Sequence, residues 1–442
     1  MDRDACGVRA ERFAAYIDDL SSVLEDARRH GPMAGYCTGL LMPAERKSVE
    51  PLAALTAPER TAAQHQSLLH FVGKGDWSDD AVMAKVREHV VPKMEKHGAI
   101  TAWIIDDTGF PKKGKHSVGV ARQYCGQLGK QDNCQVAVSL SIANDHASLP
   151  IAYRLYLPES WASDRERRAK AGVPEDIDFK TKPQIALAQI MWAHAQDLLR
   201  GAGLFDAGYG ADAKFRDGVT ALDLRYVAGV KSTNTVWAKL DAGNAEAAPR
   251  SSDSRQADVE MRMSVERLAL ALSDDAWRKI SWRDGTNEKL EGRFARVRVR
   301  PASDRQVAIE DIPEEWLLIE WPEDEKKPTK FWFSTLRENI TFKHLVHIAK
   351  LRWRIERDYL ELKQEIGLGH FEGRGWRGFH HHATLCIAAY GFLVSERADF
   401  PPSKTPDAGV FEMPALPESQ RPRGAAGADA TPRAGFARHA AA

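Results

Sequence analysis

Three acidic positions carry residue types that could bind metal ions. They are Asp106 with Asp107 in "WIIDDTGFPKKG", Asp206 in "GLFDAGYG", and Glu356 in "LRWRIERDYLELKQEIGL". If these side chains converge in space, their oxygens form the kind of cluster that Mg²⁺ or Mn²⁺ prefers. Two such ions about 4 Å apart can activate an attacking oxygen and stabilise a leaving oxygen, which is the chemistry of phosphodiester cleavage and transfer.

Basic residues accompany two of the three acidic positions. Lysine and arginine side chains bind phosphate oxygens through charge-assisted hydrogen bonds, so cations beside such a cluster could hold the rest of a nucleic-acid substrate. Those that follow the paired aspartates or flank the glutamate are Lys112, Lys113, Lys115, Arg122, Arg352 and Lys363.

Each acidic residue also has an ordinary structural role open to it. An aspartate between a strand and a loop often caps a turn or a helix, and for either aspartate position taken alone that role is the more frequent one. Glu356 follows Arg352 by four residues, so the two could form a surface ion pair worth roughly 0.3–0.5 kcal/mol. The spacing leaves both interpretations open, and only convergence in the fold separates them.

The amino-acid composition excludes some classes of protein but does not indicate a binding partner. The 62 Lys and Arg residues balance the 62 Asp and Glu residues, so local patterns carry more information than net charge. The five cysteines include no C-x-x-C pair, which argues against a structural zinc site. The odd cysteine count, the lack of an apolar leader and the lack of about 18 consecutive apolar residues predict a cytoplasmic protein without a membrane span.

The apolar pattern divides the chain into five segments that must position these residues. Residues 1–95 show the spacing of amphipathic helices, and residues 96–221 are predicted to form strands and then a helix. A β pattern returns over 222–340, and a helical pattern containing the glutamate follows over 341–398. The segment 399–442 is rich in Pro, Ala and Gly without periodicity and is predicted to be disordered. Two predicted strand ends would therefore present the aspartates, and a helix the glutamate.

Four longer phrases resemble one known family. They are "GLLMPAERKSVEPLA", "DDTGFPKKGKHSVGVARQYCGQLGKQDNCQVAVSLS", "DAGYG" and "RWRIERDYLELKQEIGLGHFEGRGWRGFHHHATLCIAAYGFL", which together span most of residues 13–397. The chain resembles bacterial insertion-sequence transposases of the DDE class, and in particular insertion-sequence family 701. The resemblance implies an α/β fold in which an RNase H-like catalytic core is interrupted by a β-rich insertion domain. A helical N-terminal domain that binds DNA would precede the core.

The resemblance also implies roles for the acidic residues. The first metal ligand of the family stands directly before a threonine, which is the position of Asp107, and Asp106 is the second choice. Because side chains alternate along a strand, Asp106 would then point to the other side. Asp206 would be the second ligand and Glu356 the third, holding two Mg²⁺ or Mn²⁺ ions.

The glutamate helix matches a wider signature of this class, Tyr-x2-Arg-x3-Glu-x6-Lys. Arg352, Glu356 and Lys363 have the required spacing. Ala349 stands where the signature has tyrosine, and that tyrosine is associated with contact to DNA. The departure leaves the implied metal chemistry in place and removes one implied phosphate contact.

A basic strand within the predicted insertion is a further candidate for contact with DNA. Arg296, Arg298 and Arg300 alternate with valines, so their side chains share one face. The family resemblance requires a positive surface here, which favours binding of the DNA backbone. The alternative is the solvated face of an edge strand, where charges block aggregation.

Three other residues have both a DNA-binding and a structural interpretation. Lys231 and Trp237 lie in "VKSTNTVW", where an aromatic side chain could stack on a base or simply belong to the core. Arg374 lies in the glycine-rich phrase "HFEGRGWRGFH", which could contact DNA or another subunit.

The function implied by the resemblance is DNA transposition. Such an enzyme binds the terminal inverted repeats of an insertion sequence as a homodimer in the bacterial cytoplasm, at the nucleoid. It cleaves phosphodiester bonds at the ends of the element and joins the 3′-OH ends to double-stranded target DNA. One alternative is an inactive or domesticated relative that binds DNA without cutting. Another is a metal-dependent nuclease on the same core, which releases ends and stops.

Overall fold

The part of the chain before the first strand, less than a quarter of its length, is helical. The computed structural model describes residues 3–238, 261–284, 289–302 and 307–401, so most of the predicted tail, from residue 402, lies outside the described residues. The helices are α1 (Arg3–Ser21), α2 (His30–Leu41), α3 (Val49–Thr56), α4 (Thr61–Gly73) and α5 (Asp79–Glu95). Short 3₁₀ turns, Ala27–Arg29 and Pro58–Arg60, connect some of them. The helical pattern predicted for this part of the sequence is therefore confirmed.

The central sheet has the mixed arrangement expected of an RNase H-like core. Its first strands are β1 (Ala102–Pro111), β2 (Ala121–Cys125), β3 (Lys130–Ala143), β4 (Ser148–Leu155), β5 (Ala202–Phe205) and β6 (Tyr226–Val230). β3 runs antiparallel to β1, β2 and β4, whereas β5 runs parallel to both β1 and β6. Because β1 and β5 are parallel neighbours with Ile104 opposite Leu204, β5 ends level with the middle of β1. The prediction that a strand ends at Asp106 and Asp107 is therefore wrong, since β1 continues through both residues to Pro111.

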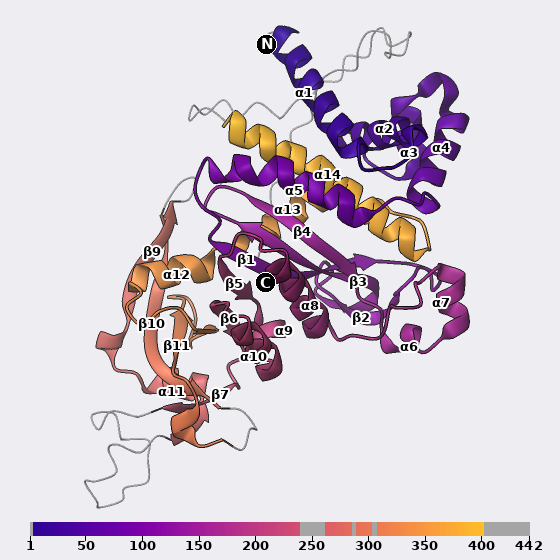
Figure 1. Ribbon diagram of the computed structural model, residues 1–442. Coiled ribbons are helices and arrows are strands. Elements are labelled where there is room, and N and C mark those ends of the chain that lie inside the picture. The colour runs from indigo at the N-terminus through magenta and orange to yellow at the C-terminus, as the bar shows by residue number, and fades with distance from the viewer. Residues whose placement is uncertain (1–2, 239–260, 285–288, 303–306, 402–442) are drawn as a thin grey trace, which may run out of the picture.

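Helices cover both faces of this sheet. The helices between β4 and β6 are α6 (Glu159–Ala162), α7 (Arg165–Ala171), α8 (Lys182–Ala195), α9 (Ala207–Gly210) and α10 (Ala213–Ala221). The C-terminal helices are α12 (Phe342–Lys350), α13 (Trp353–Gln364) and α14 (Trp376–Asp399). Figure 1 shows α5 and α14 side by side over the sheet, and α14 also packs on β4. α8 packs on β3 from the opposite side.

The β-rich insertion continues the same sheet. Its elements are β7 (Thr235–Ala238), β8 (Met261–Ser264), α11 (Val265–Ala271), β9 (Arg278–Asp284), β10 (Lys289–Pro301), β11 (Glu315–Trp321) and β12 (Lys330–Ser334). β12 pairs with β6, and β11, β10, β7 and β8 follow in order, with β9 on β10. β6 follows the predicted boundary at residue 221, yet it pairs with the core strand β5. The structure confirms the α/β class with a helical N-terminal region.

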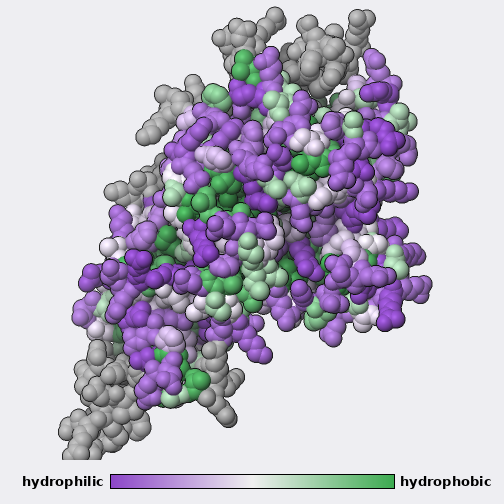
Figure 2. Space-filling model, viewed as in Figure 1, coloured by the Kyte–Doolittle hydropathy of each residue, from purple (hydrophilic) through white to green (hydrophobic). Residues whose placement is uncertain are grey.

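The surface and the helices of the described residues carry two further observations. Figure 2 shows a face that is mostly hydrophilic, with hydrophobic residues in small groups among the polar ones. Among the described helices, none combines the length and the apolar character that crossing a membrane requires.

A buried histidine links α14 to the N-terminal helices. His382 is 2% exposed. Its Nδ1 accepts a hydrogen bond from Tyr36 Oη at 2.9 Å, and its Nε2 donates to the carbonyl of Gly367 at 3.1 Å. Burial lowers the pKa of His382 from 6.5 to about 4. The folded protein therefore holds this ring neutral at pH values where an unfolded chain would protonate it.

The His382 pKa predicts a loss of stability in mild acid. A depressed pKa contributes stability that is present above 6.5 and is lost as the pH falls towards 4. Between pH 7 and pH 5 this histidine should lower the free energy of unfolding by about 2 kcal/mol. Urea unfolding of wild type and His382→Gln at both pH values tests this, with exposed His30→Gln as the matched control. An equal pH dependence in all three proteins would contradict the assignment.

Candidate metal and nucleic-acid site

The two adjacent aspartates of β1 point to opposite faces of the sheet. Asp106 lies opposite Ser139 of β3, and Ser139 Oγ is hydrogen-bonded to Tyr359 Oη of α13, so this face is the one that the glutamate helix covers. Asp107 faces α8 instead. Its Oδ2 accepts from Lys182 Nζ at 2.7 Å and from Tyr209 Oη at 3.2 Å. The alternation of the strand thus separates the two carboxylates that the sequence could not distinguish.

One guanidinium, that of Arg352, meets the acidic residues on the α13 face. Its Nη1 lies 3.0 Å from Asp106 Oδ2, as an ion pair rather than a well-aligned hydrogen bond. Its Nη2 lies 3.7 Å from Glu356 Oε1. Burial lowers the pKa of Arg352, but the charges of Asp106, Asp206 and Glu356 together raise it above its usual value. Arg352 therefore contacts Asp106 and Glu356, and Asp206 lines the same groove as Arg352 and Glu356.

Asp106 is a largely buried carboxyl group with a raised pKa. Burial raises the pKa of Asp106 to about 6, Arg352 opposes the rise, and the charges of Asp206 and Asp107 add to it. Its side chain is only 15% exposed. A carboxylate in this environment is stabilised by any further positive charge that comes close.

Asp206 caps a short helix in the structure. It follows β5 directly, and its Oδ1 accepts a hydrogen bond from the backbone N–H of Gly208 at 2.8 Å, which caps α9. Because β5 is parallel to β1 and Leu204 pairs with Ile104, this cap lies beside the part of β1 that carries Asp106 and Asp107. The cap fixes the direction of the carboxylate and leaves Oδ2 for other contacts.

A groove of about 460 Å³ connects Asp206 and Glu356. The Glu356 side chain is 68% exposed, so it is accessible to a ligand. Aromatic and basic side chains from α12, α13 and the insertion form the rest of the lining. They include Trp282, Arg283, Lys330, Trp332, Lys350 and Trp353. The groove thus joins carboxylates to π faces and cations, a combination suited to nucleic acid.

The donor chemistry of this cluster fits a hard divalent cation. Asp106, Asp206 and Glu356 offer only carboxylate oxygens, which Mg²⁺ and Mn²⁺ prefer. In the part of the chain that the structure describes, no three acidic, histidine or cysteine side chains are already grouped closely enough to enclose an ion. Arg352 provides the positive charge between them, so an ion would have to replace part of that contact.

Two of the predicted phosphate-binding cations are held by backbone groups near the acidic residues. Lys363 Nζ donates to the carbonyl of Gly109 in β1 at 2.8 Å. Lys112 Nζ donates to the carbonyl of Phe371 at 2.7 Å. Burial lowers the pKa of both lysines. Their first role is to connect β1 to α13 and to the loop before α14.

Other predicted DNA-binding residues lie on the surface. Lys113, Lys115 and Arg122 are exposed in the loop after β1 and on β2. Arg374, before α14, and Lys231, after β6, are exposed as well.

Trp237 of β7 lies partly buried opposite Arg300 of β10. It is not among the residues that line the groove beside Glu356. The structure therefore does not bring Trp237 to the acidic cluster.

The basic strand of the insertion is engaged in contacts within the chain. Arg296 Nη1 donates to the carbonyl of Ile340 at 2.7 Å, and its guanidinium lies over Trp316. Arg298 Nη2 donates to the carbonyl of Glu314 at 2.7 Å. Arg300 Nη1 donates to the carbonyl of Ile312 at 2.6 Å. These arginines share a face as predicted, and that face is largely occupied by neighbouring segments.

Several residues at the site have no counterpart in the predictions from sequence. Lys182, the partner of Asp107, opens α8 directly after Thr181, whose capping box fixes the start of that helix. The threonine and the proline at this helix start could have been recognised in the sequence as the beginning of a helix. Trp282, Trp332 and Trp353 come from three separate elements, and nothing in their local sequence indicates that they line one groove.

Comparison with known proteins places the chain in a family. A family model described as "DDE superfamily endonuclease" matches residues 19–289, more than half of the chain, and one described as "Transposase DDE domain" matches residues 194–392. The chain is 27% identical over 222 residues to a protein of Microchaete diplosiphon named "Probable transposase for insertion sequence element IS701". That match covers 50% of this chain and 54% of the relative, about half the length of each. The chain belongs to the DDE superfamily endonucleases.

Proposed function

We propose that this protein is a transposase that cuts and joins DNA with the Asp106, Asp206 and Glu356 cluster. The observation that carries the proposal is the position of Arg352, which lies 3.0 Å from Asp106 and 3.7 Å from Glu356 and lines one groove with Asp206 and Glu356. The residues come from β1, the end of β5 and α13, and they are far apart in sequence. A surface ion pair between Arg352 and Glu356 alone would not require the two buried or capping aspartates.

Asp106, Asp206 and Glu356 are the side chains that would hold Mg²⁺ or Mn²⁺. Bound there as a pair, such ions supply activation of the attacking oxygen and stabilisation of the leaving oxygen. Asp107, which the family resemblance favours as the first ligand, is the alternative to Asp106 within the same proposal. Its contacts with Lys182 and Tyr209 on the α8 face support a positioning role.

The protein residues around the cluster prepare it for a phosphodiester. Arg352 balances the carboxylates before a substrate arrives and can then move to a phosphate oxygen, where a guanidinium binds in a bidentate way. The side chains of Trp282, Trp332 and Trp353 line the groove, and the cations of Arg283 and Lys350 lie over these rings. Water or a 3′-OH would attack from the groove, and no covalent enzyme intermediate is needed.

The partners of this activity follow from the same proposal. The substrates are the double-stranded ends of an insertion sequence and a target duplex, in the cytoplasm of a bacterium at its nucleoid. Two copies of the chain would pair the two ends as a homodimer. The helical region before β1 and the exposed cations near the groove would hold the terminal inverted repeats.

A cleavage and joining assay tests this function. Duplexes made from the DNA that flanks the coding region are incubated with the protein and Mg²⁺, Mn²⁺ or EDTA, together with a supercoiled plasmid. We expect metal-dependent cuts at the element's ends and covalent joining of the 3′ ends to the plasmid. Cuts without joining would favour a nuclease, and specific binding without cuts would favour an inactive relative.

The exposed cations near the first strand predict a measurable salt effect. Replacing Lys113, Lys115 and Arg122 with alanine should weaken DNA binding for all sequences and reduce the steepness of log K against log salt by about 2 to 3. Fluorescence anisotropy over a salt series measures this slope. The matched control is Lys96, Arg200 and Arg225, three exposed cations that precede β1, β5 and β6 at the opposite sheet edge. Equal slopes for both triple variants would contradict the predicted DNA path.

A further inference from the structure

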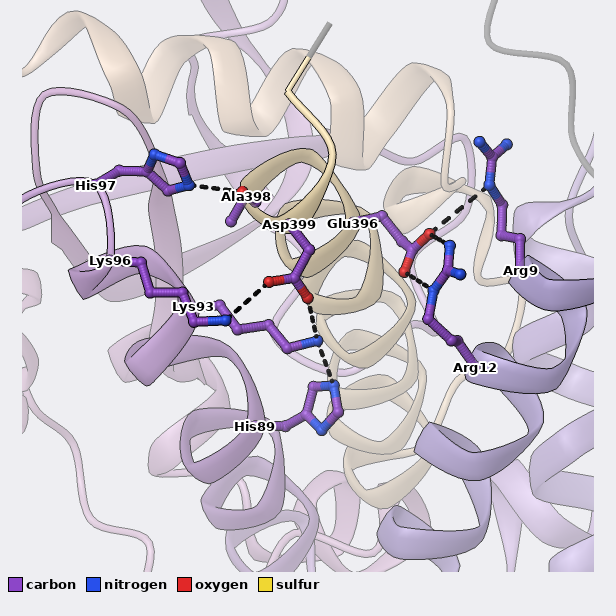
Figure 3. Close-up of polar contacts among 9 residues, drawn as sticks. All are labelled: Arg9, Arg12, His89, Lys93, Lys96, His97, Glu396, Ala398 and Asp399. Carbon is purple, nitrogen blue, oxygen red and sulfur yellow. Dashed lines mark hydrogen bonds and ion pairs between the residues drawn. The ribbon is translucent and has the colours of Figure 1, made fainter. Parts of the chain in front are cut away.

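A second cavity, of about 540 Å³, lies on the other side of the glutamate helix. Its walls come from α1, the turn between β3 and β4, α13 and the end of α14. Figure 3 shows part of its rim, where Arg9 and Arg12 of α1 meet Glu396 of α14 and His97 meets the backbone of Ala398. Trp353 lines both this cavity and the groove beside Glu356, so the two are neighbours.

The cavity contains a buried hydrogen-bond acceptor that the protein leaves unused. Asp358 is 3% exposed. Its Oδ1 accepts from Ser148 Oγ at 2.7 Å and from Tyr390 Oη at 2.8 Å. Its Oδ2 is buried and has no hydrogen-bond partner among the described residues. Leaving such an atom without a partner costs about 1–3 kcal/mol, so it is a position where a ligand's N–H would be stabilised.

A buried donor lies one turn away on the same helix. Arg354 Nε has no hydrogen-bond partner among the described residues, and its guanidinium lies 5.0 Å over the Trp353 ring. The neighbouring Arg357 and Arg397 differ from Arg354, because both form ion pairs with Glu361. Asp358 and Arg354 are not within ion-pair distance of each other in the described structure, so the acceptor and the donor stay separate.

Aromatic side chains enclose the space around these two groups. Trp353, Tyr390, Phe400, His97 and His146 all line the cavity. Flat rings of this kind stack on nucleobases, at about 1–3 kcal/mol per base. A planar ligand that presents an N–H beside a ring nitrogen or carbonyl oxygen would satisfy both polar groups and the aromatic walls.

We propose that this cavity binds one nucleobase of a nucleotide. Asp358 Oδ2 accepts from an N–H of the base, Arg354 donates to a neighbouring acceptor of the base, and the aromatic residues contact its faces. The same chemistry is offered by a free nucleotide and by a base in a DNA strand that passes from the groove over Trp353. Only the second source rests on the proposed transposase function.

Calorimetric titration with the four 2′-deoxynucleoside 5′-monophosphates, and separately with short single-stranded oligonucleotides of one base each, tests the proposal. We expect binding to at least one base in one of the two arms. Asp358→Asn keeps the acceptor for Ser148 and Tyr390 but puts an N–H where the ligand's N–H must bind. It should weaken binding by about tenfold to a hundredfold, and Arg354→Gln should do the same. Arg28→Ala, which removes an exposed side chain paired with Asp26, is the control and should bind as wild type does.

Each outcome of these titrations decides the proposal. Absence of binding in both arms, or binding that survives both Asp358→Asn and Arg354→Gln, overturns it. If Asp358→Asn does not fold, as judged by thermal melting, Arg354→Gln alone decides. Binding only in the oligonucleotide arm assigns the site to a DNA strand. Glu356→Gln separates the two functions, because it should stop cleavage and leave base binding intact.

Discussion

Replacing Glu356 with glutamine, or Asp206 with asparagine, is expected to lower metal-dependent DNA cleavage by about a thousandfold or more. Loss of one carboxylate from a divalent-cation site removes several kcal/mol of transition-state stabilisation, and about 4 kcal/mol corresponds to a factor of a thousand. DNA binding should stay within about twofold, because phosphate contacts supply most of the affinity. Gel assays of cleavage and anisotropy measurements of binding, made on the same preparations, give both values.

The fold should tolerate both substitutions, which makes the result interpretable. Glu356 is largely exposed, and asparagine at position 206 can still accept the N–H of Gly208. A readout independent of activity is the rise in melting temperature on adding Mg²⁺, which wild type should show and Glu356→Gln should not. Glu365→Gln, an exposed glutamate at the end of the same helix, is the matched control and should retain cleavage. Full activity in Glu356→Gln or Asp206→Asn would remove that residue from the site.

The adjacent aspartates of β1 should differ sharply when each is replaced with asparagine. Asp106→Asn is expected to lose about a thousandfold in cleavage, since it faces Arg352 and the helix of Glu356. Asp107→Asn should lose about tenfold, because Lys182 and Tyr209 hold that carboxylate on the other face and asparagine keeps part of this contact.

Comparing Asp106→Asn with Asp107→Asn shows whether the geometry of the structure or the family resemblance identifies the correct ligand. If Asp107→Asn is the inactive variant and Asp106→Asn cuts DNA, the resemblance has identified the ligand, and β1 must turn or shift when metal and DNA bind. Melting temperatures control for folding. Loss of the Lys182–Asp107 pair, which is partly exposed, should cost at most about 1 kcal/mol.

The sequence was most informative where local periodicity and short-range spacing determine structure. The helices before β1 and the short strand before Asp206 lie where the apolar pattern predicts them, whereas β1 continues through Asp106 and Asp107 to Pro111. The four-residue spacing of Arg352 and Glu356 gives the expected ion pair. What the spacing could not reveal is that the same guanidinium also reaches Asp106, because this contact depends on how α13 packs on the sheet.

The limits of sequence reasoning are clearest at β1 and β10. Alternation predicts that Asp106 and Asp107 face opposite ways, but only the packing of α8 and α13 decides which face each one meets. Arg296 and Arg298 share a face as predicted, yet carbonyl groups from positions 340 and 314 occupy it. Both outcomes depend on segments distant in the chain, which residue patterns within a strand do not encode.

The unbroken path of strands from β2 to β8 means that the β-rich segment cannot be removed to make a minimal enzyme. Cutting it out would remove β12 from β6 and turn β6 into an edge strand with a row of unpaired backbone donors and acceptors. The exposed edge strand of the shortened chain could then pair with the same strand of another copy, which leads to aggregation. A smaller version of this protein would need another segment that pairs with β6 or shields its backbone groups.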